Sequence, residues 1–356
     1  MENKITLTID GKKVESVPGK TVLEVARENN IYIPTLCYHP RTGKAGKCRA
    51  CLVEIEGQRA LKESCALTAT EGMVVKTNTS VITELRKMIV ELHLSNGEHN
   101  CYSCERNGNC ELQDMAYHCG IERPHFPIEH KRIALDESSE GIIRDSNKCI
   151  QCGRCIRSCN NNVMHEVLDF GWRSGNMRVI CDDDKPMGES SCVQCGECAQ
   201  VCPVGAITFK NAKGIGQYWT LDKTKVICTY CGVGCSIDMF TKDNKFVYSL
   251  GTEENWQNQT NKGMLCVKGR FGFDFLNRED RLKTPLIRKN GKLEEASWDE
   301  ALDLVASKFT EIKKTHGAGA LGFFTSARVT NEENYAVMRL ARGVVGTNNI
   351  DHCARL

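Results

Sequence analysis

Cysteine is the residue type that stands out, because 22 of the 356 residues are cysteine and most of them lie in short runs. Within a run the spacing is two or three residues, which makes intrachain disulfide pairing sterically awkward. Disulfide scaffolds are also typical of short secreted domains, and the opening residues, MENKITLTIDGKKVES, contain no apolar export segment. Thiolate ligation of metal is therefore the favoured chemistry, with disulfides as the disfavoured alternative.

Two runs of C-x2-C-x2-C-x3-C that share a Q-C-G core are the most specific signal. In two-cluster ferredoxins, three cysteines of each run bind one 4Fe–4S cluster and the fourth ligates the neighbouring cluster. The predicted ligand sets are Cys149, Cys152, Cys155 and Cys202 for one cluster, and Cys192, Cys195, Cys198 and Cys159 for the other. A single zinc ion could not use eight thiolates, and two zinc ions would not require this near-repeat. The second run ends in the expected Pro203, whereas Asn160 follows the first.

A group near the start follows C-x10-C-x2-C-x13-C, on Cys37, Cys48, Cys51 and Cys65. Plant-type 2Fe–2S sites use x4 and x2 gaps, so the wider first gap is a variant of that pattern. The loop RTGKAGKCRAC contains glycines that let backbone amides turn toward sulfur and stabilise thiolate charge. Zinc also accepts four thiolates and is the alternative, but the paired runs downstream favour a 2Fe–2S cluster here.

Cys101, Cys104 and Cys110 supply three ligands where a 4Fe–4S cluster needs four. His93 and His99 stand just upstream. An isolated histidine is more often a surface or packing residue, but the open coordination position favours ligation by one of the two. His99 is preferred, because it lies on the expected loop that leads into Cys101.

The last group follows C-x2-C-x3-C-x30-C and predicts a further 4Fe–4S site on Cys228, Cys231, Cys235 and Cys266. Lys268 stands two residues beyond the last cysteine, where a cation could bridge the cluster to an anionic group. Composition alone would favour a solvated surface lysine at that position. Cys119, Cys181 and Cys353 remain and receive no role, because a free cysteine is usually a small buried hydrophobe.

Periodicity and turn signals predict the elements around the first cysteine groups. Residues 5–17 alternate as two strands around an Asp10–Gly11 hairpin signal. A helix then begins at Thr21, which is spaced from Glu24 as a capping box. A second helix precedes Gly97, and its expected apolar face consists of Ile82, Leu85, Ile89 and Leu92.

The last segment of the chain predicts an α/β arrangement. Ser297 and Glu300 cap a helix with apolar residues at helical spacing, and ALGFF, residues 320–324, predicts a strand. Thr330 with Glu333 caps the final helix.

Charge and hydropathy exclude several classes of partner. The formal net charge is +2 with 26% charged residues, which indicates neither a nucleic acid nor an anionic membrane surface. No stretch approaches the roughly 18 apolar residues that a membrane span needs. We therefore expect a soluble, cytoplasmic chain without a membrane span.

The order of the cysteine groups resembles known families. In chain order, the first group (Cys37 to Cys65), the second group (Cys101 to Cys110) and the third group (the paired runs) resemble the N-terminal half of the large iron–sulfur subunit of complex I and of iron-only hydrogenases. The fourth group is the one that ends at Cys266. From CTYCGVGC and GMLCVKGRFGFDF onward, and in ASWDEALDLVASKF and TNEENYAVMRLARGVVGTNNIDHCARL, the chain resembles the catalytic subunits of molybdenum- or tungsten-bis-pterin formate dehydrogenases. Within that family, the chain resembles the anaerobic NAD(P)-linked or electron-bifurcating enzymes. The alternative assignment, a hydrogenase, would need a further cysteine-rich catalytic domain, and the CTYCGVGC segment argues against it.

This resemblance implies a multidomain α+β chain. It implies a 2Fe–2S ferredoxin-like (β-grasp) domain at 1–78, a histidine-plus-three-cysteine 4Fe–4S domain at 79–120, and a double 4Fe–4S ferredoxin module at 139–210. A 4Fe–4S domain of the molybdopterin oxidoreductase type follows at 222–282, and residues 283–356 begin an incomplete bis-pterin-binding α/β domain. Relatives commonly place the histidine ligand where Gly97 stands here, two residues before His99.

The resemblance implies reversible oxidation of formate to carbon dioxide for the full-length subunit. One 2Fe–2S and four 4Fe–4S clusters would relay electrons between a Mo- or W-bis-pterin guanine dinucleotide centre and a partner subunit. The partner would be a flavin and iron–sulfur subunit that serves NAD(P) or ferredoxin. Lys268 would lie between the last 4Fe–4S cluster and the pterin. No nicotinamide motif is present in the chain. No catalytic residue is expected within it, because the family's metal-binding selenocysteine or cysteine would come directly after Leu356; we expect a reading frame ended at a UGA codon. The alternative is a stand-alone multi-cluster electron-transfer subunit without formate chemistry.

Overall fold

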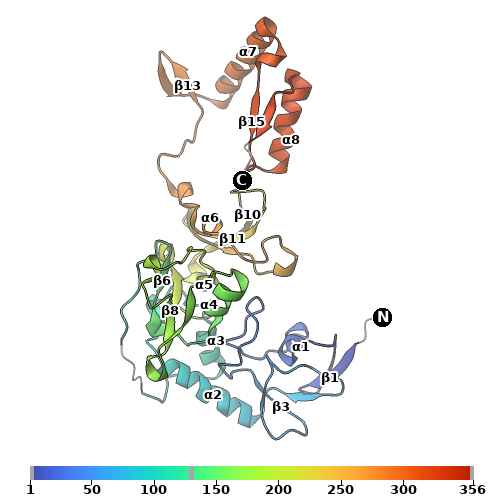
Figure 1. Cartoon of the computed structure of the whole chain (residues 1–356), viewed down its shortest axis with the longest axis vertical. Coiled ribbons are helices and arrows are strands. Elements are labelled where there is room, and N and C mark those ends of the chain that lie inside the picture. Colours follow the sequence, from blue (N-terminus) through green and yellow to red (C-terminus); the bar gives the residue numbers. More distant parts are fainter. Residues whose placement is uncertain (1–3, 128–131, 353–356) are drawn as a thin grey trace. The chain divides into compact units, whose positions relative to one another are not determined.

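A computed structural model describes residues 4–127 and 132–352, which divide after Asp222 into two compact units (Figure 1). Cys353, which received no role, and the position after Leu356 lie outside the described residues. In the first unit, β1 (Ile5–Ile9) and β2 (Lys12–Ser16) form the predicted hairpin, with Asp10 and Gly11 both at positive φ. This conformation suits the turn, since asparagine, aspartate and glycine tolerate it best.

The hairpin belongs to a five-stranded mixed sheet in the order β2-β1-β5-β3-β4. Its other strands are β3 (Leu52–Ile55), β4 (Lys62–Glu63) and β5 (Val74–Lys76), and β5 runs parallel to β1. The helix α1 (Val22–Glu28) begins with the predicted Thr21–Glu24 capping box and buries its apolar side in the same core as the strands. Cys51 and Cys65 of the first cysteine group belong to this core.

Two helices surround the second cysteine group. The helix α2 (Ser80–Ser95) precedes it, the short η1 (Cys101–Ser103) contains its first cysteine, and α3 (Glu111–His118) follows Cys110. The predicted apolar face of α2 is only partly correct, because Leu92 is exposed whereas Arg86 and Glu91 are buried. Arg86 lies inward because its guanidinium donates to the carbonyls of Ala50, Leu52 and Thr77 beneath the helix.

The remainder of the first unit is built on two small antiparallel pairs. The strand β6 (Ile142–Arg144) pairs with β9 (Ile207–Phe209), and β7 (Leu168–Gly171) pairs with β8 (Arg178–Cys181). The short helices α4 (Arg154–Arg157) and α5 (Glu197–Val201) follow the two Q-C-G motifs. Single-turn elements complete this part: η2 (Ser146–Lys148), η3 (Ser158–Asn162), η4 (Ser174–Asn176), η5 (Met187–Glu189), η6 (Lys210–Ala212) and η7 (Tyr218–Thr220).

A three-stranded sheet in the order β10-β11-β12 lies at the start of the second unit, and only Asp222, the first residue of β10, belongs to the first unit. These strands are β10 (Asp222–Ile227), β11 (Ser236–Lys242) and β12 (Lys245–Gly251), and α6 (Val267–Phe271) contacts β12. The short helices η8 (Trp256–Asn258) and η9 (Asp274–Asn277) flank α6 in sequence.

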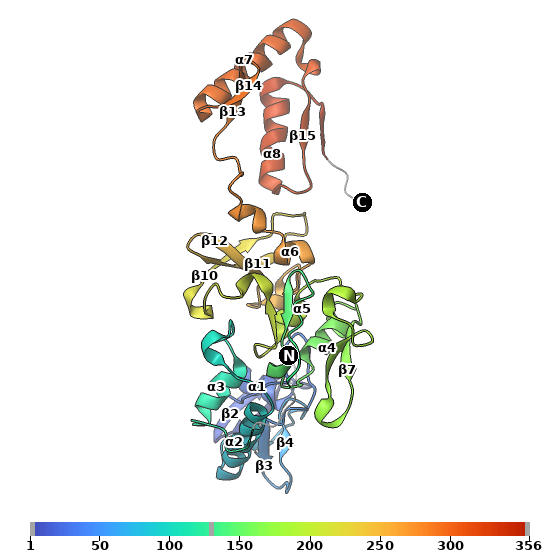
Figure 2. The ribbon, with the colours of Figure 1, turned by 90° about the vertical axis from the view of Figure 1, so that its left-hand side faces the viewer.

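The last part of the second unit is a hairpin followed by an α/β arrangement (Figure 2). The hairpin strands β13 (Leu286–Lys289) and β14 (Lys292–Glu295) precede α7 (Trp298–His316) and η10 (Ala318–Ala320). The expected strand at 320–324 appears as β15 (Phe323–Thr325), and β16 (Ile350–His352) runs parallel to it. The helix α8 (Asn331–Arg339) has the predicted Thr330–Glu333 capping box and continues into η11 (Leu340–Val345).

None of the described helices is both long and apolar enough to cross a membrane.

Candidate metal centres

The paired cysteine runs line two small, mainly apolar cavities in the first unit. One cavity is surrounded by the sulfur-bearing residues Cys149, Cys152, Cys155 and Cys202. The other is surrounded by Cys159, Cys192, Cys195 and Cys198. Each cavity therefore takes three cysteines from one run and the fourth from the other, which is the grouping expected of a two-cluster ferredoxin.

The two runs have the same local backbone. Gln151 and Gln194 both lie at positive φ, and their amides donate to the Sγ atoms of Cys149 at 3.4 Å and Cys192 at 3.3 Å. Gly153 and Gly196 lie in the left-handed region directly before α4 and α5. The positive φ values turn amide groups toward sulfur, and such hydrogen bonds stabilise a thiolate ligand.

Burial makes these thiols unfavourable places for uncompensated negative charge. It raises the pKa of Cys149 to about 11 and that of Cys152 to about 12, and it raises the pKa of Cys155 and Cys198 well above the usual value. Neighbouring thiols of the same set add to each increase. A cationic metal core would supply the missing compensation, since metal binding deprotonates a coordinating thiol.

In the paired runs, each set of four cysteines lines a cavity. A multi-iron cluster fits a ring of separated thiols around a cavity better than a tetrahedral zinc ion does, because four zinc ligands must meet at one centre. The donor set and cavities of the paired runs therefore fit 4Fe–4S clusters.

The first cysteine group is buried beside the five-stranded sheet, with its members at Cys37, Cys48, Cys51 and Cys65. A hydrogen bond from the Cys48 thiol, with further bonds from the amides of Cys48 and Lys47, lowers the pKa of Cys37 to about 5. The Cys65 thiol likewise lowers the pKa of Cys51, to about 7. Amides of the glycine-containing loop do turn toward sulfur, as its composition predicts. The four thiols interact with one another, which fits a compact 2Fe–2S site.

The second group lies where α2, α3 and the paired-run region meet. Cys101 is exposed, Cys104 is buried, and Cys110 is the residue before α3. Cys104 packs so tightly on Gly205 that a Cβ atom there would stand 2.5 Å from its Sγ. His93 and His99 interact with each other, and burial is the main cause that lowers the pKa of His93. Ligation by His99 stays a prediction, with His93 as the other candidate.

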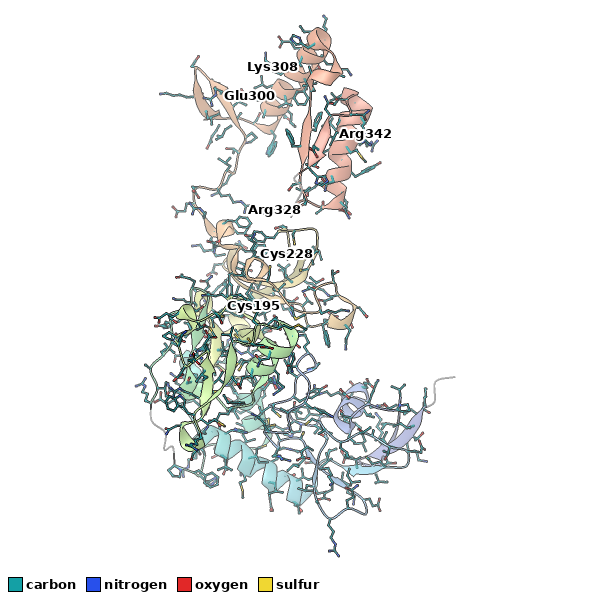
Figure 3. The ribbon with its side chains drawn as sticks, in the orientation of Figure 1. Cys195, Cys228, Glu300, Lys308, Arg328 and Arg342 are labelled. Atoms are coloured by element: carbon teal, nitrogen blue, oxygen red, sulfur yellow. The ribbon has the colours of Figure 1, made fainter. Side chains whose placement is uncertain are left out.

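The fourth group lies in the second unit, at the end of β10 and the start of α6. Figure 3 marks Cys228, whose side chain belongs to a small core with Ile237, Phe246, Leu265 and Phe273. Burial, aided by the thiols of Cys228, Cys231 and Cys266, raises the pKa of Cys235 to about 11, so the four predicted ligands lie together. Lys268 is exposed on α6.

Sequence reasoning missed several arginines around these groups. Arg270, two residues after Lys268, is fully buried and donates to the carbonyl of Ser249. Arg154 makes a bidentate pair with Glu111 at 2.5 and 2.6 Å, which joins the second and third cysteine groups. Arg41 and Glu197 form a buried ion pair between the first group's loop and α5. The sequence signal that could have pointed to these arginines is a charged residue close to a cysteine motif.

Five family models match consecutive parts of the chain. They are a 2Fe–2S iron–sulfur cluster binding domain (2–80), the NADH-ubiquinone oxidoreductase-G iron–sulfur binding region (86–125) and a 4Fe–4S dicluster domain (148–207). The molybdopterin oxidoreductase Fe4S4 domain (221–278) and the molybdopterin oxidoreductase family (281–356) follow. The expected order of domains agrees with these matches, and the expected boundaries stay predictions.

Curated relatives match the whole chain. A Bacillus subtilis protein named as a "probable oxidoreductase" is 38% identical over 100% of this chain and 40% of its own length. A Staphylococcus aureus protein named as a "putative formate dehydrogenase" is 34% identical over 100% of this chain and 39% of its own length. The chain thus spans about two fifths of the length of these relatives.

A solved structure shares the arrangement of part of the chain. It is a chain of an NAD+-reducing NiFe hydrogenase in the H2-reduced state, 35% identical, with a TM-score of 0.56. The match covers 60% of this chain and 90% of that one.

Proposed function

The chain carries the iron–sulfur domains of a formate-dehydrogenase-like molybdopterin oxidoreductase subunit, and from this premise we propose that residues 1–282 bind one 2Fe–2S and four 4Fe–4S clusters that relay electrons. The two cavities lined by crossed cysteine sets are the observation that carries the proposal. Such clusters accept and release one electron at a time, and the protein tunes them through hydrogen bonds, burial and nearby charge.

The chain's own residues perform the positioning. The amides of Gln151 and Gln194 donate to ligand sulfurs, and apolar residues such as Ile150 and Val193 line the cavities and limit water. Exclusion of water strengthens every electrostatic interaction with a bound cluster. In the fourth group, the exposed Lys268 would face a pterin centre and provide a cation there.

For the whole protein we propose oxidation of formate or reduction of carbon dioxide at a molybdenum or tungsten pterin centre. The names of the Staphylococcus aureus relatives and the two molybdopterin oxidoreductase matches support this assignment. The proposed partner is a flavin and iron–sulfur subunit linked to NAD(P) or ferredoxin, supported by the likeness to the NAD+-reducing hydrogenase chain. A cytoplasmic location follows from such a partner. The alternative is a stand-alone electron-transfer subunit with the same clusters.

The test of cluster binding is anaerobic reconstitution of the full chain with iron and sulfide. We expect iron and sulfide contents that match one 2Fe–2S and four 4Fe–4S clusters, and reduced samples should show several distinct electron paramagnetic resonance signals. Stoichiometric zinc with no acid-labile sulfide would contradict the proposal.

Matched cysteine variants locate the ligands. Cys152→Ala should remove the signal of one 4Fe–4S cluster, because Cys152 lines the first cavity. Cys119→Ala is the control, since Cys119 directly follows α3 and lies outside the predicted ligand sets. Equal cluster content in the two variants would remove Cys152 from the ligand set.

A further inference from the structure

Arg157, the last residue of α4, joins the backbones of two candidate cluster sites. Its Nη1 donates to the carbonyl of Cys152 at 3.2 Å, and its Nη2 donates to the carbonyl of Cys37. Its Nε donates to the carbonyl of Thr42 at 3.2 Å. Cys152 belongs to a predicted 4Fe–4S set and Cys37 to the 2Fe–2S set, so one guanidinium connects segments more than a hundred residues apart.

The surroundings confine this side chain. A Cβ atom on Gly153 would lie 3.2 Å from Nη1 of Arg157 and 3.4 Å from the ring of Phe170, so the guanidinium occupies a narrow space. Two further contacts join the loop of the first cysteine group to the paired-run region. Lys47 Nζ lies 3.7 Å from the centroid of the Phe170 ring, and Arg41 pairs with Glu197. The Arg157 guanidinium also interacts electrostatically with the thiols of Cys152, Cys37 and Cys155.

Building on the proposed function, in which these cysteines hold clusters, we propose that Arg157 is a positioning residue for two neighbouring centres. It fixes the Cys37–Thr42 segment against the Cys152 segment, and it holds a positive charge between the two cysteine sets. A positive charge favours the more negative, reduced state of a nearby cluster, so the charge raises both reduction potentials. Only a planar guanidinium can donate in a fixed fork to carbonyls from both segments, which a lysine cannot reproduce.

Two substitutions in the full chain separate charge from geometry. Arg157→Met removes both, so the reduction potentials of the 2Fe–2S centre and of the cluster at Cys152 should shift downward together. Amide hydrogen exchange of residues 37–43 should also become faster. Arg157→Lys keeps the charge and loses the fork, so the potentials should stay close to wild type while exchange in that segment still becomes faster.

The measurements are redox titration followed by electron paramagnetic resonance, and hydrogen exchange read by mass spectrometry. Arg173→Met is the matched control, because Arg173 is an exposed arginine of the same cluster-binding region and should change neither readout. Wild-type potentials and wild-type exchange in Arg157→Met would overturn the inference. So would a shift of equal size in Arg173→Met, which would indicate a general effect of net charge.

The proposed function and this inference fail in different ways. Absence of clusters from the reconstituted wild-type chain would contradict the proposed function, and hydrogen exchange on the cluster-free chain would still test whether Arg157 holds the two segments together. If Arg157→Met does not take up clusters, Arg157→Lys provides the comparison. Wild-type exchange in both variants would then overturn the positioning role.

Discussion

Single residues other than cysteine determine whether the sulfurs can reach their positions. Gly205 lies against Cys104, and a Cβ atom there would stand 2.5 Å from the sulfur, which real Cβ atoms essentially never do. The interior is close-packed, so Cys104 or the Gly205 backbone would have to move. Because Cys104 belongs to the group that has only three cysteines, a displaced sulfur there has no spare cysteine to replace it.

Gly205→Ala should therefore weaken or abolish the cluster signal of the Cys101, Cys104 and Cys110 site, and the paired-run clusters should keep theirs. Electron paramagnetic resonance of the reduced, reconstituted chain measures this. Gly175→Ala is the control, because a Cβ atom on Gly175 meets nothing within 4 Å. An unchanged spectrum in Gly205→Ala would show that the contact relaxes without cost.

At the scale of elements, local sequence signals predicted most of what is formed by neighbours in the chain. The Asp10–Gly11 hairpin and the capping boxes at Thr21 and Thr330 appear as expected, because each depends on contacts within a few residues. The pairing of β1 with β5 and the packing of α2 depend on residues far apart in sequence. Periodicity alone assigned Leu92 to the buried face of α2, since it could not show that carbonyls beneath the helix attract Arg86.

The candidate sites show the same contrast between local sequence signals and contacts that are distant in sequence. Cysteine spacing predicted which four cysteines line each cavity of the paired runs, and their ligation of clusters stays a prediction. Spacing carried no signal for Arg154 with Glu111 or for Arg41 with Glu197, which join groups that lie far apart in the chain. Those contacts depend on how separate domains dock.

Arg86 should matter more for stability than a surface arginine would. Arg86→Met leaves the carbonyls of Ala50 and Thr77 without their donor, and an unsatisfied buried polar group costs about 1–3 kcal/mol. The free energy of unfolding of the N-terminal domain, followed by the visible absorbance of its 2Fe–2S site in denaturant, should fall by about that amount. Lys87→Met, on the adjacent half-exposed position, should have little effect. Equal losses in the two variants would contradict a specific role for Arg86.

At the scale of the whole molecule, the parts differ in how well they cover their apolar surface. The N-terminal sheet and α1 share a core in which Val22, Leu23 and Val53 are fully buried. In the last part of the second unit, α7 has no buried residue, and Trp298 and Phe324 are 68% and 88% exposed. Exposed apolar faces of this kind contribute little to stability and mark a surface that another body could cover.

Limited proteolysis should therefore cut residues 283–352 first. Few buried contacts hold this part, so its local opening costs less free energy than opening of the cluster-binding domains. Cleavage followed by mass spectrometry should release fragments of this region while residues 4–222 persist, and reconstitution with clusters should widen the difference because ligands stabilise only the state that binds them. Equal rates of cleavage along the reconstituted chain would show that α7 and α8 form a core as stable as that of the N-terminal sheet, despite their exposed apolar side chains.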